Sequence, residues 1–292
     1  MPELPEVEVI LRDLAPAVVG RRIVEVRIEP GSERLAALYP PRELARQLEG
    51  RRIAEASRRG KYLIFRLDDG RYFVVHLRMT GRAVIRRAED RERPPEPFQR
   101  ALVRFEDGSE LRWADVRKFG VWQIVDRLVE LERRLGPEPL SRSFTWHALA
   151  QRLAGRRAPV KAVLLDQRRI AGVGNIYADE ALHLARIHPA TPAGELADDQ
   201  TRRLHRALRS VLRQGIRNFG SSFRDFVNAF GEEGRNREHL RVYGRAGEPC
   251  PRCGAPIERI VVASRGTHYC PRCQPSARRP AERARRETAA VP

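Results

Sequence analysis

The first residues of the chain, "MPELPEVEVI", contain a group that could act as a nucleophile. Removal of Met1, which is usual ahead of a small second residue, would leave Pro2 as a free secondary amine with Glu3 beside it. An α-amino group has an ordinary pKa of about 8, so a useful fraction of it is neutral at pH 7. The alternative is a proline–glutamate start that caps a helix and does no chemistry. Taken alone, the segment fits either interpretation.

All four cysteines lie close together near the end of the sequence, in the pattern C-x2-C-x16-C-x2-C. Two close pairs separated by a hairpin are typical of a structural zinc site with four thiolate ligands. The alternative, two disulfides, is not expected in a cytoplasmic protein. The predicted ligands of one structural Zn²⁺ are Cys250, Cys253, Cys270 and Cys273. Four ligands close the coordination shell, so this zinc would hold structure, and the hairpin should project Arg265 from its tip. No organic cofactor is expected.

The charge balance predicts a polyanionic partner. The chain has 56 basic and 38 acidic residues, a net charge of +18 and a pI near 11.0. Such an excess most simply indicates binding to nucleic acid, although an arginine-rich protein from a GC-rich genome would share it. Only three of the basic residues are lysines, namely Lys61, Lys118 and Lys161. A compact ammonium acts differently from a guanidinium, so these three are candidate site residues, unless they are chance survivors.

Length and hydropathy indicate a soluble protein of two ordinary domains. The chain has 292 residues, 41% of them hydrophobic, which is enough for a packed core. No apolar run approaches the roughly 20 residues that span a bilayer. The start is acidic and interrupted by proline, so it does not fit a signal peptide. A cytoplasmic location without membrane contact is expected.

Hydrophobic periodicity divides the chain into a β half and a helical half. Residues 4–19 have apolar positions at helical spacing, with Pro5 in the first turn and Gly20 at the end. From 21 to about 125 the period is two, with "DDG" and "DG" as hairpin turns and a loop over 88–97. This half is expected to form an antiparallel β-sandwich or barrel after a terminal helix.

The second half is predicted to be helical. "LGPEPLS" at 135–141 fits a linker, and 143–217 contains four helical segments. Gly172 and Gly174 separate two of them in a helix–turn–helix type of connection, in which Asn175 is expected to cap the second helix. Plain helical packing explains such a pair equally well. The tail over 276–292 is arginine-rich and polar, and is expected to be a basic, disordered segment.

Several motifs, in this order, resemble the formamidopyrimidine-DNA glycosylase (Fpg, also MutM) family of bifunctional DNA glycosylases and AP lyases. The motifs are "PELPEVE" (2–8), "RRGKYL" (58–63), "HLRMTG" (76–81), "DVRKFG" (115–120), "GVGNIYADEAL" (172–182) and the cysteine hairpin.

The resemblance implies an α+β multidomain fold. An N-terminal antiparallel β-sandwich with a terminal helix precedes a helix–two-turns–helix domain and a β-hairpin zinc finger. The expected boundaries are 1–130 for the catalytic domain, 131–150 for a linker, 151–240 for the helical DNA-binding domain, 241–275 for the finger and 276–292 for the tail.

The resemblance also implies how Pro2 would react. In this family the terminal amine attacks C1′ of the damaged nucleotide and releases the base, and β- and δ-elimination then cut the strand. Glu3 is the expected acid/base, and Glu6 supports it at the start of the helix. Lys61 matches the family's catalytic lysine. Arg265 matches the finger arginine that grips phosphates and is linked to δ-elimination.

The remaining implied residues contact DNA. Flipping a base out of the duplex leaves a hole. By resemblance Met79, Arg117 and Phe119 fill this hole, although Met79 and Phe119 also fit ordinary core packing. Arg117 would bond to the base opposite the lesion. Four further residues are expected on the DNA backbone, Lys161 and Asn175 by clear matches and Arg100 and Arg156 by loose ones.

The chain departs from the family pattern in two stretches and in one lysine. Phe98 and Arg100 stand in "PFQRALVRF", where histidines are common in the family. Arg235 stands where an aromatic is common, within the expected lesion-recognition loop over 228–240. Lys118 lies in "DVRKFG", where the family tolerates arginine, so the resemblance does not explain why lysine is kept there.

The implied function is base-excision repair of oxidised purines, such as 8-oxoguanine and formamidopyrimidines, in damaged double-stranded DNA. The expected enzyme is a monomer of bacterial type, associated with the nucleoid through its DNA binding. The alternatives are an endonuclease VIII-like glycosylase for oxidised pyrimidines, a zinc-containing DNA-binding protein without catalysis, and a zinc-ribbon RNA-binding protein.

Overall fold

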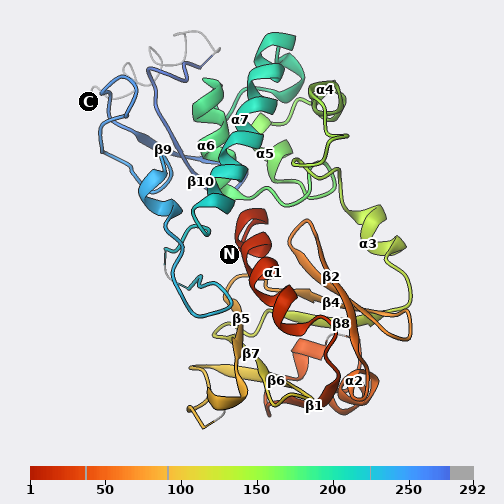
Figure 1. Cartoon of the computed structure of the whole chain (residues 1–292). Coiled ribbons are helices and arrows are strands. Elements are labelled where there is room, and N and C mark those ends of the chain that lie inside the picture. Colours follow the sequence, from red (N-terminus) through yellow and green to blue (C-terminus); the bar gives the residue numbers. More distant parts are fainter. Residues whose placement is uncertain (37, 91, 224, 277–292) are drawn as a thin grey trace, which may run out of the picture. The chain divides into compact units, whose positions relative to one another are not determined.

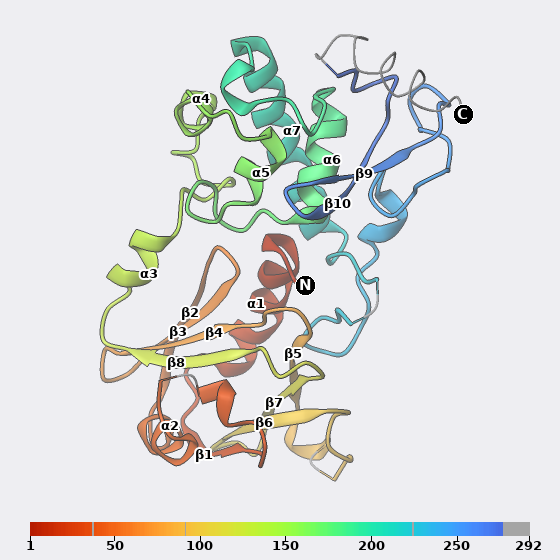
Figure 2. The same cartoon turned by 180° about the vertical axis from the view of Figure 1, so that it is seen from behind.

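The computed structural model describes residues 1–36, 38–90, 92–223 and 225–276 (Figures 1 and 2). The predicted tail over 276–292 lies, apart from its first residue, outside this part of the chain. Two compact units are present, and each combines segments distant in sequence. The first contains Met1–Leu140, Gln167–Val173 and Leu212–His239; the second contains Ser141–Asp166, Gly174–Val211 and the chain from Leu240 onward. The predicted boundaries treated each domain as one continuous stretch.

Two four-stranded antiparallel sheets form the first unit, as the period-two pattern predicted. One sheet has the order β1 (Ile23–Ile28), β6 (Gln99–Phe105), β7 (Glu110–Asp115), β5 (Gly81–Arg86). The other has the order β2 (Ile53–Arg59), β3 (Tyr62–Leu67), β4 (Tyr72–His76), β8 (Val121–Val125). One apolar cluster takes side chains from both sheets. The expected hairpins at "DDG" and "DG" are β3–β4 and β6–β7.

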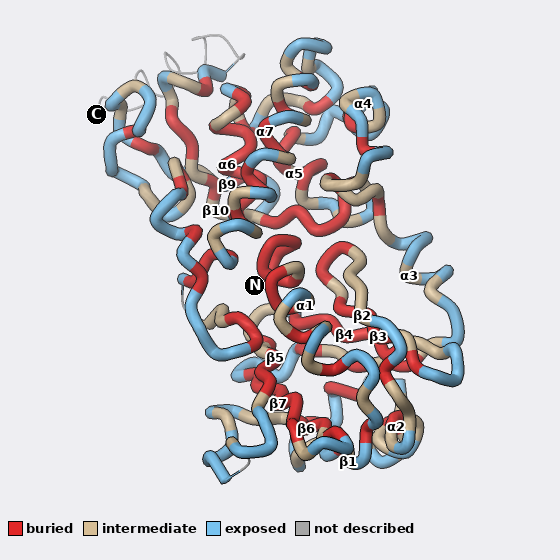
Figure 3. Tube along the Cα trace, viewed as in Figure 1, coloured by how far each residue is buried: buried red, intermediate tan, exposed pale blue. Residues whose placement is uncertain are grey.

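Helix α1 (Leu4–Val18) packs its apolar stripe against this sandwich. Val7, Ile10 and Leu14 are each at most 1% exposed, and Figure 3 shows the buried positions recurring along the helix. Glu3 and Glu6 form a reciprocal capping box at its start, which satisfies backbone N–H groups that a helix end leaves unpaired. The first turn of α1 is therefore fixed, and Pro2 lies directly before it.

A helix that the sequence analysis missed, α2 (Pro41–Leu48), interrupts the β half. Its only fully buried residues are Leu44 and Leu48, four positions apart, and Pro41 begins the helix. Two large apolar residues in eight positions are too few for the helical period to stand out between strands.

The segment predicted as a linker takes part in the first unit. Helix α3 (Val129–Arg134) precedes it, and Glu138 accepts hydrogen bonds from the Gly60 N–H and from Arg58 and Arg59. Proline and glycine in "LGPEPLS" do mark an irregular backbone, but the charged residue between them anchors it.

In the second unit the predicted helices are confirmed. They are α4 (Trp146–Leu153), α5 (Val160–Leu165), α6 (Asn175–Ala185) and α7 (Asp198–Arg217), whose last turn belongs to the first unit. The hairpin of β9 (Glu258–Val262) and β10 (Arg265–Tyr269) is antiparallel. Short 3-10 turns complete the fold at Glu33–Ala36, Ala88–Asp90, Ala193–Glu195 and Asn236–His239. Among the described residues, no helix has both the length and the apolar character to cross a membrane.

We predict that Leu14→Ala destabilises the first unit by about 3 kcal/mol, because Leu14 is fully buried in the core and its truncation leaves a cavity. Thermal unfolding followed by circular dichroism measures this. Arg12→Ala, on the exposed side of the same helix, is the matched control and should cost much less. Equal shifts for the two variants would contradict the packing described here.

Candidate active site and nucleic-acid interface

The N-terminal residues are held against the loop Gln167–Val173. The Leu4 N–H donates to the Gly172 carbonyl at 2.9 Å, and both Pro2 and Glu3 are buried. Gly172 has a φ of +83°, and a Cβ added to it would lie 2.7 Å from the Leu4 Cβ. Only glycine fits this conformation and this approach without strain. This hydrogen bond and this close approach therefore fix the position of the first residues of α1 relative to the loop.

Glu6 fixes the same helix end from a second side. Its Oε2 accepts from the Glu3 N–H and its Oε1 accepts from the Ser221 N–H, each at 2.9 Å. The side chain is 1% exposed, so both bonds lie in a medium of low dielectric constant. Glu6 thus joins the start of α1 to the segment after α7.

Lys61 lies in the β2–β3 turn, which reaches the same loop. Lys61 is 5% exposed, and a Cβ added to the preceding Gly60 would lie 3.6 Å from the Ala171 Cβ and 3.7 Å from the Gly172 nitrogen. Behind the turn, Arg58 pairs with Glu8 at 2.9 Å and with Glu138 at 3.0 Å.

This ion-pair network fixes the charge beside the turn. Burial alone would raise the pKa of Glu8, but the guanidiniums of Arg58 and Arg12 bring it below its ordinary value. The structure therefore brings Pro2, Glu3, Glu6 and Lys61 together around one short loop.

His76 belongs beside this group and was missed in the sequence analysis. It pairs with Tyr62 across the β3–β4 ladder, one residue from Lys61, and it is 8% exposed. Burial, followed by the charges of Arg78 and Lys61, lowers its pKa to about 3, so it is neutral at pH 7. Its Nδ1 accepts from the Arg78 N–H at 2.9 Å. The signal was present in the sequence, as a histidine at a strand end opposite a turn lysine.

The proposed void-filling residues lie on two loops of the first unit, and they are not core residues. Phe119 is 44% exposed, Met79 is half-buried outside the core cluster, and the Arg117 guanidinium lies 4.8 Å from the Phe119 ring centroid. Core packing, the alternative for Met79 and Phe119, is therefore wrong for both.

Two basic residues make contacts within the first unit near this loop. Between Arg117 and Phe119, Lys118 donates from Nζ to the Gly31 carbonyl at 2.9 Å. Arg100 Nε donates to the Asp115 carbonyl at 2.9 Å, next to the same loop.

In the second unit, Lys161 lies in a buried network of polar contacts. Its side chain is fully buried, and its Nζ lies 2.6 Å from Asp179 Oδ1 and 2.7 Å from Thr267 Oγ1, to which it donates. It also donates to the Gly266 carbonyl at 3.2 Å. The ammonium therefore links β10 to α6.

Asn175 does not cap α6, contrary to prediction. The N-cap residue is Gly174, and Asn175 is the first residue of the helix. Its Nδ2 donates to the Gly266 carbonyl at 2.9 Å, while its Oδ1 is buried without a hydrogen-bond partner. Arg265, which precedes Gly266, is exposed just after the hairpin turn. The start of α6 and the hairpin residue Arg265 are thus adjacent. Arg156 is exposed in the loop between α4 and α5.

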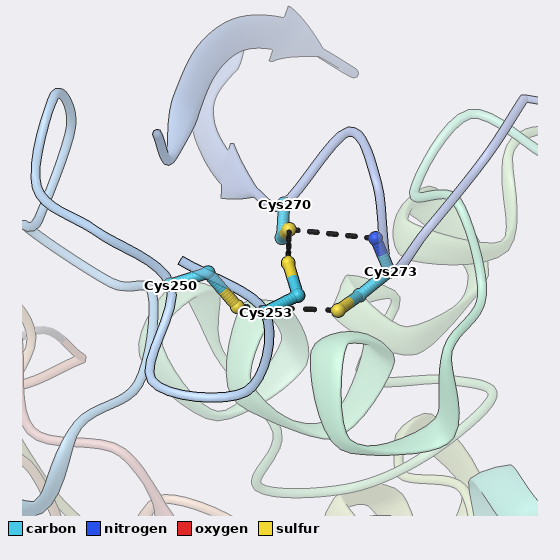
Figure 4. Close-up of side chains that lie close together, drawn as sticks. All are labelled: Cys250, Cys253, Cys270 and Cys273. Atoms are coloured by element: carbon cyan, nitrogen blue, oxygen red, sulfur yellow. Dashed lines mark hydrogen bonds between the residues drawn. The ribbon is translucent and has the colours of Figure 1, made fainter. Parts of the chain in front are cut away.

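The four cysteines form a site suited to zinc (Figure 4). Their sulfurs lie within 4.8 Å of one another, with 4.0 Å between those of Cys250 and Cys273 and 3.5 Å between those of Cys253 and Cys270. All four are free thiols. A tetrahedron with Zn–S bonds of about 2.3 Å has S–S edges of about 3.8 Å, so the type, number and spacing of these donors suit the ion. His183 Nε2 lies 3.4 Å from the Cys250 sulfur, so α6 contacts the site directly.

Three family models match the chain. The N-terminal domain of formamidopyrimidine-DNA glycosylase matches residues 1–122, the H2TH domain of formamidopyrimidine-DNA glycosylase matches 135–227, and a zinc finger found in FPG and IleRS matches 247–275.

Relatives cover nearly the whole chain. A formamidopyrimidine-DNA glycosylase of Herpetosiphon aurantiacus is 46% identical over 276 residues, which is 94% of this chain and 100% of the relative. The Lactococcus lactis FPG (MutM), solved with Fapy-dG-containing DNA, has a TM-score of 0.85 at 37% identity. MutM in complex with DNA containing carbocyclic 8-oxo-G has a TM-score of 0.85 at 38% identity. Both alignments cover 94% of this chain and 100% of the solved one.

We predict that Cys253→Ser abolishes retention of zinc, because three thiolates cannot close the tetrahedral shell. Elemental analysis after dialysis against a chelator should give about one zinc per wild-type chain and almost none for the variant. Val261→Ala, at a position of β9 that is 71% exposed, is the matched control and should keep the metal. Full retention by Cys253→Ser would rule out this ligand set.

We also predict that His76 makes the first unit less stable as the pH falls from 6.5 to 5. The folded pKa is about 3 and the ordinary value is 6.5, so in this range the unfolded chain takes up a proton that the folded chain does not. The free energy of unfolding should fall by at most about 1.4 kcal/mol per pH unit from this group. Urea unfolding of His76→Gln should show a shallower dependence on pH. Parallel curves for the variant and the wild type would show that His76 is not held neutral.

Proposed function

The chain belongs to the formamidopyrimidine-DNA glycosylase family, and from this premise we propose that it excises oxidised purines from duplex DNA and then cuts the strand. The observation that carries the proposal is the convergence of the α1 start and the Lys61 turn on Gly172. This arrangement surrounds a chain terminus whose amine can react once Met1 is removed. 8-Oxoguanine and formamidopyrimidines are the proposed lesions.

Pro2 is the proposed nucleophile. Its neutral amine attacks C1′, the C1′–N bond to the damaged base breaks, and the base leaves with a proton. A secondary amine then forms a cationic iminium with the opened sugar. The iminium withdraws electrons, so the C2′ proton becomes acidic and the 3′-phosphate leaves by β-elimination. Loss of the 5′-phosphate by δ-elimination separates the sugar remnant from the DNA, and water then hydrolyses the iminium and restores the Pro2 amine.

Glu3 is the proposed acid/base, since its backbone is fixed beside Pro2 by Glu6. Its carboxyl group would assist opening of the sugar ring and transfer the protons of the elimination steps. Lys61 would contact the damaged nucleotide or its flanking phosphate from the opposite turn. The neutral His76 beside it adds no competing charge and offers imidazole hydrogen bonding.

Met79, Arg117 and Phe119 are proposed to occupy the space that the flipped nucleotide leaves. Phe119 offers an exposed apolar face for stacking, and the Arg117 guanidinium above it offers donors to the orphaned base. Arg100 is held at the foot of the same loop and is proposed to contact the backbone.

The second unit is proposed to bind the phosphates around the lesion. The start of α6 and the exposed Arg265 supply N–H donors and positive charge next to each other. Lys161 is proposed to serve the same surface indirectly, because it holds the hairpin in place. Arg156 is proposed as a peripheral phosphate contact. One site per chain is consistent with a monomer. A genomic DNA substrate is consistent with a cytoplasmic enzyme that associates with the nucleoid.

We predict that Pro2→Gly nearly abolishes covalent trapping to abasic DNA in the presence of borohydride, while affinity for the DNA stays within about threefold. An uncleaved N-terminal tag should have the same effect, since it removes the free amine. Gel analysis of the trapped adduct and anisotropy titration of binding measure the two effects. Normal cutting of abasic DNA by the tagged protein would refute the role of Pro2.

The same assay separates the alternatives. A DNA-binding protein without catalysis would give no adduct even as the wild type. A panel of single-lesion duplexes, in which the wild-type enzyme excised oxidised pyrimidines faster than 8-oxoguanine opposite cytosine, would favour the endonuclease VIII-like function instead.

A further inference from the structure

One buried carboxylate joins the two loops that carry Met79, Arg117 and Phe119. We call residues 77–80 and 116–119 the insertion loops. Asp115, the last residue of β7, is 1% exposed. Its Oδ1 accepts from the Thr80 hydroxyl at 2.5 Å, and its Oδ2 accepts from the Gly120 N–H at 2.7 Å. The first bond reaches one insertion loop and the second holds the end of the other.

The Thr80 hydroxyl completes the link. The Arg117 N–H lies 3.1 Å from Thr80 Oγ1 and 3.2 Å from Asp115 Oδ1, so it donates to both. The hydroxyl therefore donates to the carboxylate and accepts from the backbone of the residue proposed to read the opposite base. A hydrogen bond from a hydroxyl to a carboxylate is shorter and stronger than one between neutral groups.

Close packing against Trp113 restricts the movement of both insertion loops. A Cβ added to Gly81 would lie 2.8 Å from Trp113 Cζ2, and one added to Gly120 would lie 2.6 Å from the same atom. Both insertion loops thus end against the edge of one indole, which is itself 1% exposed. Trp113 and Asp115 lie two apart on β7, so they face the same side of the sheet.

We propose that Thr80 and Asp115 form a latch that sets the relative position of the two insertion loops. Met79, Arg117 and Phe119 then enter the duplex as one preorganised unit, and discrimination of the opposite base depends on the Thr80 hydroxyl. Thr80 and Asp115 are positioning residues, because they act through Arg117. This inference rests on the proposed function.

The latch is expected to matter at insertion and not in the later chemistry. Filling the hole left by a flipped nucleotide requires three side chains to arrive together, and small misplacements are costly in rate. An abasic nucleotide has no base to extrude, so its cleavage depends less on insertion. The two substrates therefore separate the latch from the Pro2 chemistry.

Thr80→Val tests this, since valine keeps the shape and removes the hydroxyl. We expect excision of 8-oxoguanine opposite cytosine to slow by at least about tenfold under single-turnover conditions. The preference for cytosine over adenine opposite the lesion should fall by a similar factor. Cleavage of abasic DNA and borohydride trapping should stay within about twofold of wild type. Thr80→Ser keeps the hydroxyl, and it should restore both excision and preference.

A double variant tests whether Thr80 acts through Arg117. If the latch acts through Arg117, Thr80→Val should lower the opposite-base preference no further in an Arg117→Ala background. Unchanged excision and preference in Thr80→Val would overturn the proposal, and so would an additive loss in the double variant. A parallel loss of abasic cleavage in a folded Thr80→Val protein would also overturn it. Absence of trapping by the wild type would instead refute the proposed function and leave the latch geometry unaffected.

Discussion

The approach of Leu4 to Gly172 is the constraint on which the proposed active site depends. A hydrogen bond of 2.9 Å and the lack of space for a side chain at residue 172 fix the α1 start against one loop. Gln167 braces that loop, since its Oε1 accepts from the Gly172 N–H and its Nε2 donates to the Val173 carbonyl. Residues close to a chain terminus otherwise tend to fray. These hydrogen bonds instead hold the start of α1, and with it the proposed nucleophile Pro2, against the loop.

Buried charge plays the same organising role elsewhere in both units. Glu180 accepts from the backbone N–H groups of Arg241, Val242 and Tyr243, and burial raises its pKa even so. It thereby fixes α6 to the chain that leads into the cysteine hairpin. The buried Asp115 and Glu6 and the half-buried Glu138 act alike in the first unit, each ordering a loop through N–H donors. Carboxylates with several N–H donors are well suited to this, because each keeps its hydrogen bonds in a dry interior.

Much of this was predictable from the sequence, and the failures have physical causes. Periodicity located α1, the hairpins and the helices α4 to α7, and the cysteine spacing located the metal site. Helix α2 was missed because only two of its eight residues are buried. Asn175 was predicted to cap α6 and instead bonds to Gly266 on β10. The burial of Lys161 was not visible in the sequence, because its partner Asp179 comes from another element. A sequence shows that a lysine is present, but its burial depends on contacts made across the fold.

The Lys161–Asp179 pair has a consequence for the response of the protein to ionic strength. Contacts between an exposed arginine and a phosphate weaken steeply as salt is added, whereas a fully buried ion pair is hardly screened. Rising salt should therefore release the hairpin from a polyanion without loosening its attachment to α6. The hairpin that carries Arg265 should therefore keep its position on α6 whether or not a polyanion is bound, so that a new encounter does not have to order it first.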